Sequence, residues 1–132
     1  MKKNTCFCII LILLSFAAAL STCVLASTRN SLNWEGRYAG RIPAADCPGI
    51  DVQITLRSDK TFSLIYDYVD RDGFTSNMGE FEWDVTGNVI ILKNTHFPSY
   101  YRVEKDRLRQ LDMEGNEITG NLAQMYVLNK VK

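Results

Sequence analysis

The sequence predicts an all-β domain, an antiparallel meander of about eight short strands that closes into a small β-barrel and is preceded by a signal peptide. Three observations support this fold class. Apolar and polar residues alternate with a period of two almost throughout the chain after residue 34. Turn residues separate these short runs, and no segment of the domain has a convincing helical period. Closure is favoured over an open sheet because it removes exposed strand edges.

The first 26 residues differ in composition from the rest of the chain. Lys2 and Lys3 precede an uncharged, mostly apolar run over residues 6–20, which small residues follow. This order is typical of a secretory signal peptide, and the run is shorter than the roughly 20 apolar residues of a membrane span. We therefore expect residues 1–26 to be a signal peptide that is cleaved after Ala26, which would release a soluble protein.

A second cleavage site is also compatible with this region. Residues 20–23 resemble a bacterial lipobox, in which Cys23 would be acylated and become the first residue, so that the signal would be 1–22. Thr22 departs from the Gly, Ala or Ser usual before that cysteine. Residues 27–33 are expected to be a linker, and residues 34–132 the barrel domain. A membrane contact is expected only through a lipid anchor at Cys23.

The first half of the domain predicts three strands. Alternation over residues 34–42 indicates the first, and apolar residues at every second position of 51–57 indicate the next. Residues 58–60 have turn composition and lead into an expected strand at 62–68. Residues 70–77 are rich in polar side chains, and we expect them to form a loop.

The second half continues the meander. Residues 79–85 predict a strand, and Gly87-Asn88 predicts a two-residue hairpin, because such turns need residues that accept positive φ. Strands are expected at 89–93 and 100–103, with Pro98 limiting the first of these. The odd spacing of Leu108 and Leu111 predicts a bulge within 107–113. A turn at 114–116 and a last strand at 124–128 complete the expected barrel.

Charge and residue types exclude several classes of function. The 15 basic and 15 acidic residues balance, and without Lys2 and Lys3 the domain has 13 against 15, so a basic face for nucleic acid is not expected. With one histidine and no Gly-x-Ser-x-Gly turn, no enzyme signature is present. Three of the four cysteines lie in the first 26 residues, which leaves Cys47 alone and rules out a disulfide framework in the domain.

The chain resembles the N-terminal domain of the NlpE copper-resistance and envelope-stress lipoproteins from Trp34 nearly to Lys130. The residues that carry the resemblance are Trp34-x-Gly36-x-Tyr38-x-Gly40-x-Ile42-Pro43, Asp46-Cys47-Pro48-Gly49-Ile50, Leu56, Thr61-Phe62-Ser63-Leu64, Gly79-x-Phe81-x-Trp83, Leu111-Asp112-x-x-Gly115 and Tyr126-x-Leu128. The resemblance implies a lipocalin-like barrel in the bacterial envelope, and a Cys-x-x-Cys linked to copper handling and redox sensing. Here Ala44 stands at the first cysteine of that motif, so only Cys47 is kept.

Cys47 is the first candidate for site chemistry, and copper is the cofactor that the resemblance implies. A single thiol cannot clamp a soft metal such as Cu(I) as two thiolates do, so further ligands would have to come from Asp46, from His96 or from a methionine. An isolated cysteine is more often a small, buried apolar residue. A third reading is surface thiol chemistry in an oxidising compartment.

A set of aromatic side chains forms the second candidate site. Their alternation places them on inward faces, where they fill a barrel of eight strands or, if one end is wider, line a pocket for a small hydrophobic ligand. The residues are Trp34, Tyr38, Tyr66, Tyr68, Phe81 and Trp83.

The leading hypothesis is a noncatalytic bacterial envelope protein, in the periplasm or in the outer membrane as a lipoprotein, that acts in envelope stress sensing or copper homeostasis. One alternative is a lipocalin-like binder of a small hydrophobic ligand. Another is an interaction or inhibitor protein that binds an envelope protein partner through loops such as 70–77. No nucleic-acid partner is expected.

Overall fold

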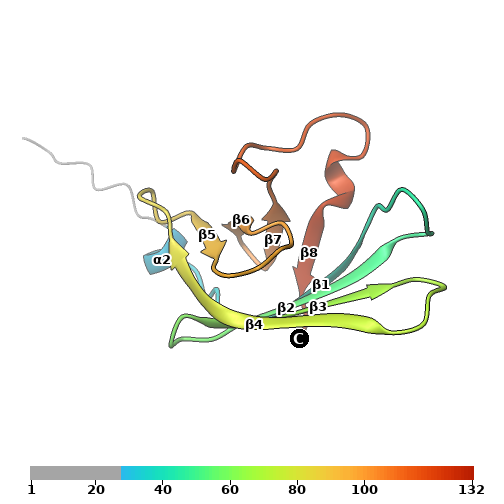
Figure 1. The fold of residues 1–132 in the computed structure, drawn as a ribbon. Helices are drawn as coiled ribbons and strands as arrows, with labels where there is room; N and C mark the ends of the chain where they lie inside the picture. The colour runs from blue at the N-terminus through green and yellow to red at the C-terminus, as the bar shows by residue number, and fades with distance from the viewer. Residues whose placement is uncertain (1–27) are drawn as a thin grey trace, which may run out of the picture.

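The computed structural model describes residues 28–132 of the chain. The signal peptide expected at 1–26, its alternative at 1–22, cleavage after Ala26 and acylation of Cys23 lie outside the described residues. Eight antiparallel strands form one closed barrel in which each strand pairs with the next and β8 pairs with β1 (Figure 1). The elements are α2 (Thr28–Ser31), β1 (Gly36–Ile42), β2 (Ile50–Leu56), β3 (Thr61–Tyr68), β4 (Phe74–Trp83), β5 (Val89–Leu92), β6 (Tyr100–Glu104), β7 (Arg107–Gln110), the 3₁₀ helix η1 (Ala123–Met125) and β8 (Val127–Lys130). The predicted fold class is confirmed.

The core lies inside the barrel, because the alternating apolar residues of every strand face inward. Val52, Ile54 and Leu64 have no exposed surface, and the same is true of Leu108 and Leu128. Closure between β1 and β8 requires a very close approach of the two backbones. A Cβ atom at Gly40 would lie 2.6 Å from the carbonyl oxygen of Val127, so only glycine fits there.

The strand β4 begins earlier than the composition predicts. Residues 70–77 were expected to be a loop, but β4 starts at Phe74 and pairs with β3 from Asp67↔Phe74 to Thr61↔Glu80. The physical reason is that β3 runs to Tyr68 and offers a partner for this segment. Most side chains in the first half of β4 are exposed to solvent. The polar composition of this segment therefore reflects its exposure and not a loop conformation.

The turn between β4 and β5 is also longer than expected. The backbone N–H of Asp84 donates to the carbonyl oxygen of Val89, with 2.8 Å between nitrogen and oxygen, and residues 85–88 lie between these two residues. The prediction of a two-residue hairpin at Gly87-Asn88 is therefore wrong. Gly87 does adopt the expected positive φ, 69°. The Asp84 carboxylate organises the turn, since its Oδ1 accepts the backbone N–H groups of Asn88 at 3.2 Å and of Val89 at 3.1 Å.

The C-terminal strands correct two further expectations. β7 pairs regularly with β6 from Arg107 to Gln110, so the odd spacing of Leu108 and Leu111 marks the end of the strand and not a bulge. Leu111 forms a single bridge with Glu117. β8 begins at Val127, because residues 123–125 form η1.

The wall of the barrel is uneven, as Figure 1 shows. The strands β1 to β4 are 7 to 10 residues long, whereas β5 to β8 have only 4 or 5. The long wall therefore extends past the short one at the end that carries the β1–β2 and β3–β4 loops.

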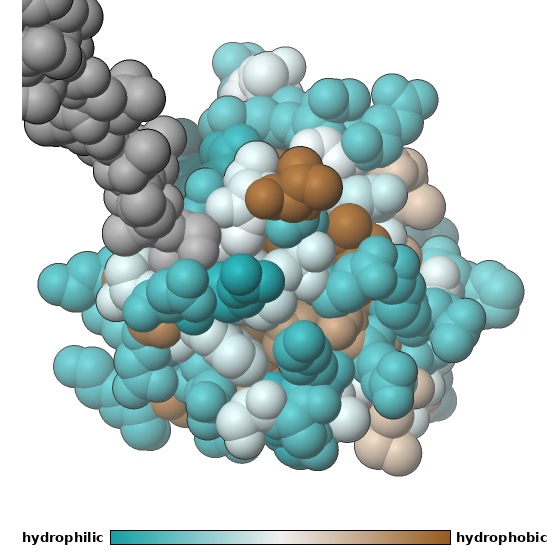
Figure 2. Space-filling view, turned by 90° about the vertical axis from the view of Figure 1, so that its left-hand side faces the viewer, coloured by the Kyte–Doolittle hydropathy of each residue, from teal (hydrophilic) through white to brown (hydrophobic). Residues whose placement is uncertain are grey.

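The segment before β1 packs against the opposite end of the barrel. Thr28 donates from its backbone N–H and from Oγ1 to Oδ1 of Asn88, at 2.9 and 2.6 Å, and Arg29 N–H donates to the Gly87 carbonyl. Within the expected linker at 27–33, residues 28–31 thus form a short helix in contact with the β4–β5 turn. Figure 2 shows a mostly hydrophilic surface on this side, with a few apolar spots. Within residues 28–132, no helix has the length and apolarity needed to cross a membrane.

Candidate functional site

Two hairpin loops lie side by side at the end where the long wall extends (Figure 1). One joins β1 to β2 over residues 43–49 and carries Cys47, and the other joins β3 to β4 over residues 69–73. A backbone hydrogen bond from Val69 N–H to the Gly49 carbonyl, 3.1 Å long, connects them. An ion pair between Arg71 and Asp46, with 2.7 Å between Nη2 and Oδ2, connects them a second time. We call this arrangement the loop pair.

Cys47 is a free thiol in the loop pair and is half-buried. Its Sγ donates to the carbonyl oxygen of Gly49 at 3.2 Å. The sequence analysis considered a buried apolar cysteine and a surface thiol. The half-buried position of Cys47 lies between these two alternatives. The thiol is held by the loop and still has contact with solvent.

The charges around Cys47 come from the ion pair. The hydrogen bond to Asp46, together with the charge of that carboxylate, raises the pKa of Arg71. The guanidinium also lies 6.0 Å from the centre of the Tyr68 ring. Both partners of the ion pair are about half exposed or more, at 48% for Arg71 and 67% for Asp46, so solvent screens it and it stabilises the fold only weakly.

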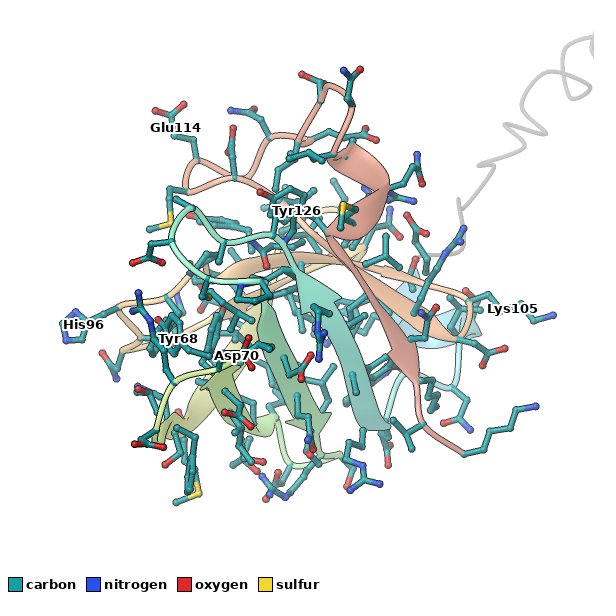
Figure 3. The ribbon with its side chains drawn as sticks, turned by 90° about the vertical axis from the view of Figure 1, so that its right-hand side faces the viewer. Tyr68, Asp70, His96, Lys105, Glu114 and Tyr126 are labelled. Atoms are coloured by element: carbon teal, nitrogen blue, oxygen red, sulfur yellow. The ribbon has the colours of Figure 1, made fainter. Side chains whose placement is uncertain are left out.

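The proposed metal ligands do not come together. Among residues 28–132, no three His, Cys, Asp or Glu side chains gather closely enough to hold a metal ion. Asp46 is paired with Arg71, and His96 is exposed in the β5–β6 loop and points away from the barrel in Figure 3. Ala44 supplies no second thiol. The donors present at the loop pair therefore do not fit a resident copper ion.

The aromatic residues that the sequence predicts to face inward do so, in two separate groups. Tyr38, Tyr66 and Phe81 are buried, and the other three are partly buried against the core. Trp34 packs edge-on against Phe81 and Trp83, with ring centres 5.7 and 5.6 Å apart. Their packing is that of a filled core. Whether a small hydrophobic ligand also binds here stays a prediction, which native mass spectrometry of the protein extracted from its own membranes would test.

Tyr66 belongs to the group nearest the loop pair, where its ring stacks on Phe97 with 4.3 Å between the centres. The Tyr38 hydroxyl, by contrast, donates to the Trp34 carbonyl at 2.7 Å. Burial and then the charge of Asp106 raise the pKa of Tyr38 to about 12. Burial also raises the pKa of Tyr66, so the Tyr38 and Tyr66 hydroxyls are neutral groups of the interior at neutral pH.

A buried polar group was missed by the sequence analysis. Tyr101 and Gln110 are paired across β6 and β7 and are 0% and 5% exposed. Within the described chain, Tyr66 Oη, Tyr101 Oη and Gln110 Oε1 are buried without a well-formed hydrogen bond. Burial raises the pKa of both tyrosines, that of Tyr101 well above its usual range. The sequence did contain a signal for the burial of Gln110. This residue lies two positions after the inward-facing Leu108, and side chains two positions apart in a strand share a face.

The fold and the loop pair define a class of protein, the small closed antiparallel barrel that carries a single thiol on a hairpin loop. The model of the NlpE N-terminal domain matches residues 38–121 of the chain. The chain therefore belongs to the NlpE family of envelope lipoproteins, and the resemblance seen in the sequence is confirmed.

Individual relatives agree with this assignment. Lipoprotein NlpE of Escherichia coli strain K12 is 32% identical over 83 residues, which are 61% of this chain and 35% of that protein. The chain thus spans about a third of the length of this curated relative.

Two solved structures share the barrel. A candidate lipoprotein of Shewanella oneidensis is 40% identical with a TM-score of 0.73, over 79% of this chain and 94% of that one. The Cpx pathway activator NlpE of E. coli is 28% identical with a TM-score of 0.55, over 65% of this chain and 46% of that one.

Proposed function

We propose that this chain is a noncatalytic envelope protein that senses envelope stress and that the loop pair is its responsive region. Family membership is the observation that carries the proposal, because the relatives that match are lipoproteins and one of them is named as a pathway activator. The interior of the barrel is filled by apolar core side chains, which leaves the loops as the surface on which a binding or signalling role is proposed.

The loop pair supports this role because it holds a thiol that is fixed in place and half-buried. Among residues 28–132 Cys47 is the one cysteine, and Ala44 removes the loop neighbour with which it would close a disulfide, so a change of its chemical state needs a reactant from outside this domain. The protein would therefore respond to its surroundings through Cys47 or through the surfaces of the two loops.

The experiment compares a deletion strain that carries the wild-type gene with one that carries Cys47→Ala, using a transcriptional reporter of envelope stress. We expect the wild type to restore induction after treatment with a reductant or excess copper, and Cys47→Ala to lower the response. Asp46→Asn is the matched control for the loop, because it removes the ion pair and keeps the thiol. Identical reporter output with and without the gene would contradict the proposal.

Copper homeostasis is the weaker branch of the proposal, since the donors at the loop pair do not fit a resident ion. Titration of the reduced, exported protein with Cu(I) against a competing chelator tests it directly. We expect that the protein has no Cu(I) site that depends on Cys47, so Cys47→Ala should not reduce the uptake of Cu(I). A stoichiometric site that depends on Cys47 would overturn this expectation and would restore the copper role.

The position of the protein in the envelope depends on how the signal is cleaved. We propose export, followed either by release into the periplasm after Ala26 or by anchoring in the outer membrane through acylated Cys23. The intact mass of the protein from its native host decides between them. A mass that begins at Ser27 means a periplasmic protein, and a triacylated mass that begins at Cys23 means a lipoprotein.

A further inference from the structure

The chain enters the barrel at the end opposite to the loop pair. Thr28 and Arg29 are fixed there by their hydrogen bonds to the β4–β5 turn. In an antiparallel meander alternate turns lie at the same end, so the other turns of this end and the C-terminal residues join them. We call this the entry end, and it consists of residues 28–35, 57–60, 84–88, 105–106 and 131–132. It lies at the left of Figure 1, and the loop pair lies at the right.

The two ends of the barrel differ in charge. With the strand residues that border it, the entry end has seven basic residues, Arg29, Arg57, Lys60, Lys105, Arg107, Lys130 and Lys132, and five acidic ones, Glu35, Asp59, Asp84, Glu104 and Asp106. The loops of the other end cover residues 43–49, 69–73, 93–99 and 111–126. They have only two basic residues, Arg71 and Lys93, against six acidic ones, Asp46, Asp70, Asp72, Asp112, Glu114 and Glu117. The barrel therefore has a basic entry end and an acidic loop end.

The side chains of the entry end suit contact with lipid headgroups. The side chain of Lys105 is exposed, as are those of Arg29, Lys60 and Lys132. Val85, in the β4–β5 turn, is fully exposed as well. Exposed cations beside an exposed apolar side chain match the surface of an anionic bilayer, where phosphate groups lie next to hydrocarbon.

The length of chain before Thr28 adds a geometric argument. The five Cα–Cα steps from Cys23 to Thr28 span at most about 18 Å in any conformation. The ten residues of β4 alone extend over about 33 Å. An acyl anchor at Cys23 would thus keep the entry end close to the headgroups, whereas the loop pair lies farther from Thr28 than this tether can reach.

We propose that the entry end of the barrel faces an anionic phospholipid surface, so that the loop pair points away from the membrane. This inference rests on the proposed acylation of Cys23. The anchor brings the barrel to the bilayer, and the charges decide whether the barrel stands on its entry end or lies on its side. Lipid phosphates attract the cations of the entry end and repel the carboxylates of the loop end. The responsive thiol is then presented to partners outside the membrane.

Energy transfer from the reconstituted lipoprotein to its membrane tests the orientation. The protein is purified from its native host, and its intact mass confirms the acylated Cys23. It is inserted into vesicles of phosphatidylcholine and phosphatidylglycerol that carry an acceptor dye on their headgroups. A donor dye is attached to Val85→Cys at the entry end or to Ala45→Cys in the loop pair, each in a Cys47→Ala background.

We expect transfer from residue 85 to exceed that from residue 45 by about twofold or more, because the two ends of the long wall lie about 33 Å apart. Both labelled positions are small, exposed and uncharged in the wild type, so they form a matched pair. Equal transfer from the two sites, or stronger transfer from residue 45, overturns the proposal.

Charge reversal separates the effect of the charges from that of the tether. Lys105→Glu at the entry end and Arg71→Glu in the loop pair change the net charge equally. We expect Lys105→Glu to reduce the difference in transfer between the two sites, and Arg71→Glu to maintain or increase it. Vesicles without phosphatidylglycerol, or high salt, should also reduce the difference. A difference that none of these changes affects contradicts the electrostatic orientation. Circular dichroism checks that each variant is folded.

Failure of this proposal is distinguishable from failure of the sensing role. A mass that begins at Ser27 removes the anchor and overturns the orientation, while the reporter experiment with Cys47→Ala still tests sensing. Conversely, the expected energy transfer together with identical reporter output with and without the gene would support the orientation and overturn the sensing role.

Discussion

At Asp84, a single carboxylate holds the turn between β4 and β5 and also carries a pH dependence. Burial alone would raise the pKa of Asp84, but the hydrogen bonds from Thr86 and from the backbone N–H groups of Val89 and Asn88 outweigh burial and lower it. A carboxylate with a lowered pKa in the folded state stabilises the fold above its unfolded value of about 4 and loses that contribution as the pH falls through the folded pKa.

We predict that Asp84→Ala lowers the free energy of unfolding at pH 7 by about 1 kcal/mol, because the backbone N–H of Val89 loses its acceptor and that of Asn88 keeps only Thr86 Oγ1. Asp84→Asn keeps an acceptor oxygen and should cost less. Urea unfolding between pH 7 and pH 3 measures both effects. The difference between wild type and Asp84→Asn should shrink below pH 4, and a constant difference would contradict the assignment.

A second residue-scale prediction concerns Tyr101, whose buried hydroxyl has no well-formed hydrogen bond within the described chain. Tyr101→Phe should change the free energy of unfolding at pH 7 by less than about 1 kcal/mol, since no good hydrogen bond is lost. Because burial raises the pKa of Tyr101 in the folded state, the fold loses stability as the pH rises above about 10, where the phenol of the unfolded chain ionises.

Alkaline unfolding followed by circular dichroism therefore distinguishes the wild type from Tyr101→Phe. The variant should keep its fold to a higher pH, because it has no buried phenol to ionise. A loss of more than about 2 kcal/mol at pH 7 would mean instead that the hydroxyl has a strong partner in solution.

Among the elements, the contact between β1 and β8 is the one that closes the barrel. We predict that Gly40→Ala costs about 1 to 3 kcal/mol, because the new methyl group overlaps the Val127 carbonyl. Gly73→Ala is the control for adding a methyl group. It meets no atom within 4 Å, and its cost comes only from a positive φ of 90°. Hydrogen exchange should show the loss in Gly40→Ala concentrated in the amides of β8.

The elements also show where sequence patterns fail. Alternation located every strand, because a half-buried strand imposes a period of two on its side chains. It missed the start of β4 at Phe74, where both faces of an edge strand are exposed and burial imposes no pattern. A bulge was predicted at the end of β7 because Leu108 and Leu111 are an odd number of positions apart. In the structure Leu111 is buried just beyond the strand, directly after the buried Gln110.

The loop pair was beyond sequence reasoning for a different reason. Asp46 and Arg71 are 25 positions apart, and only the register of β1 to β4 brings their loops together. The sequence did indicate Cys47, because it is the one cysteine after residue 26, and the resemblance to the NlpE N-terminal domain indicated the missing thiol at Ala44. Long-range pairing of exposed charges leaves no periodic signal.

For the whole molecule, we predict that β8 is indispensable. A chain that ends at residue 126 loses Leu128 from the core and the strand that pairs with both β1 and β7. It should therefore lack the far-ultraviolet circular dichroism of the barrel and elute with an expanded volume in gel filtration. Removal of Lys132 alone is the control and should leave the fold unchanged.

The closure of β1 by β8 also has a consequence for the order of folding. The hairpins β1 to β4 join neighbours in the chain, whereas Tyr38 finds its partner only at Lys130. Contacts over such separations form slowly, because the intervening chain must first be ordered. If the chain crosses a membrane from its N-terminus, the groove beside Gly40 stays open until the last residues arrive. Export and the final step of folding are then coupled in time.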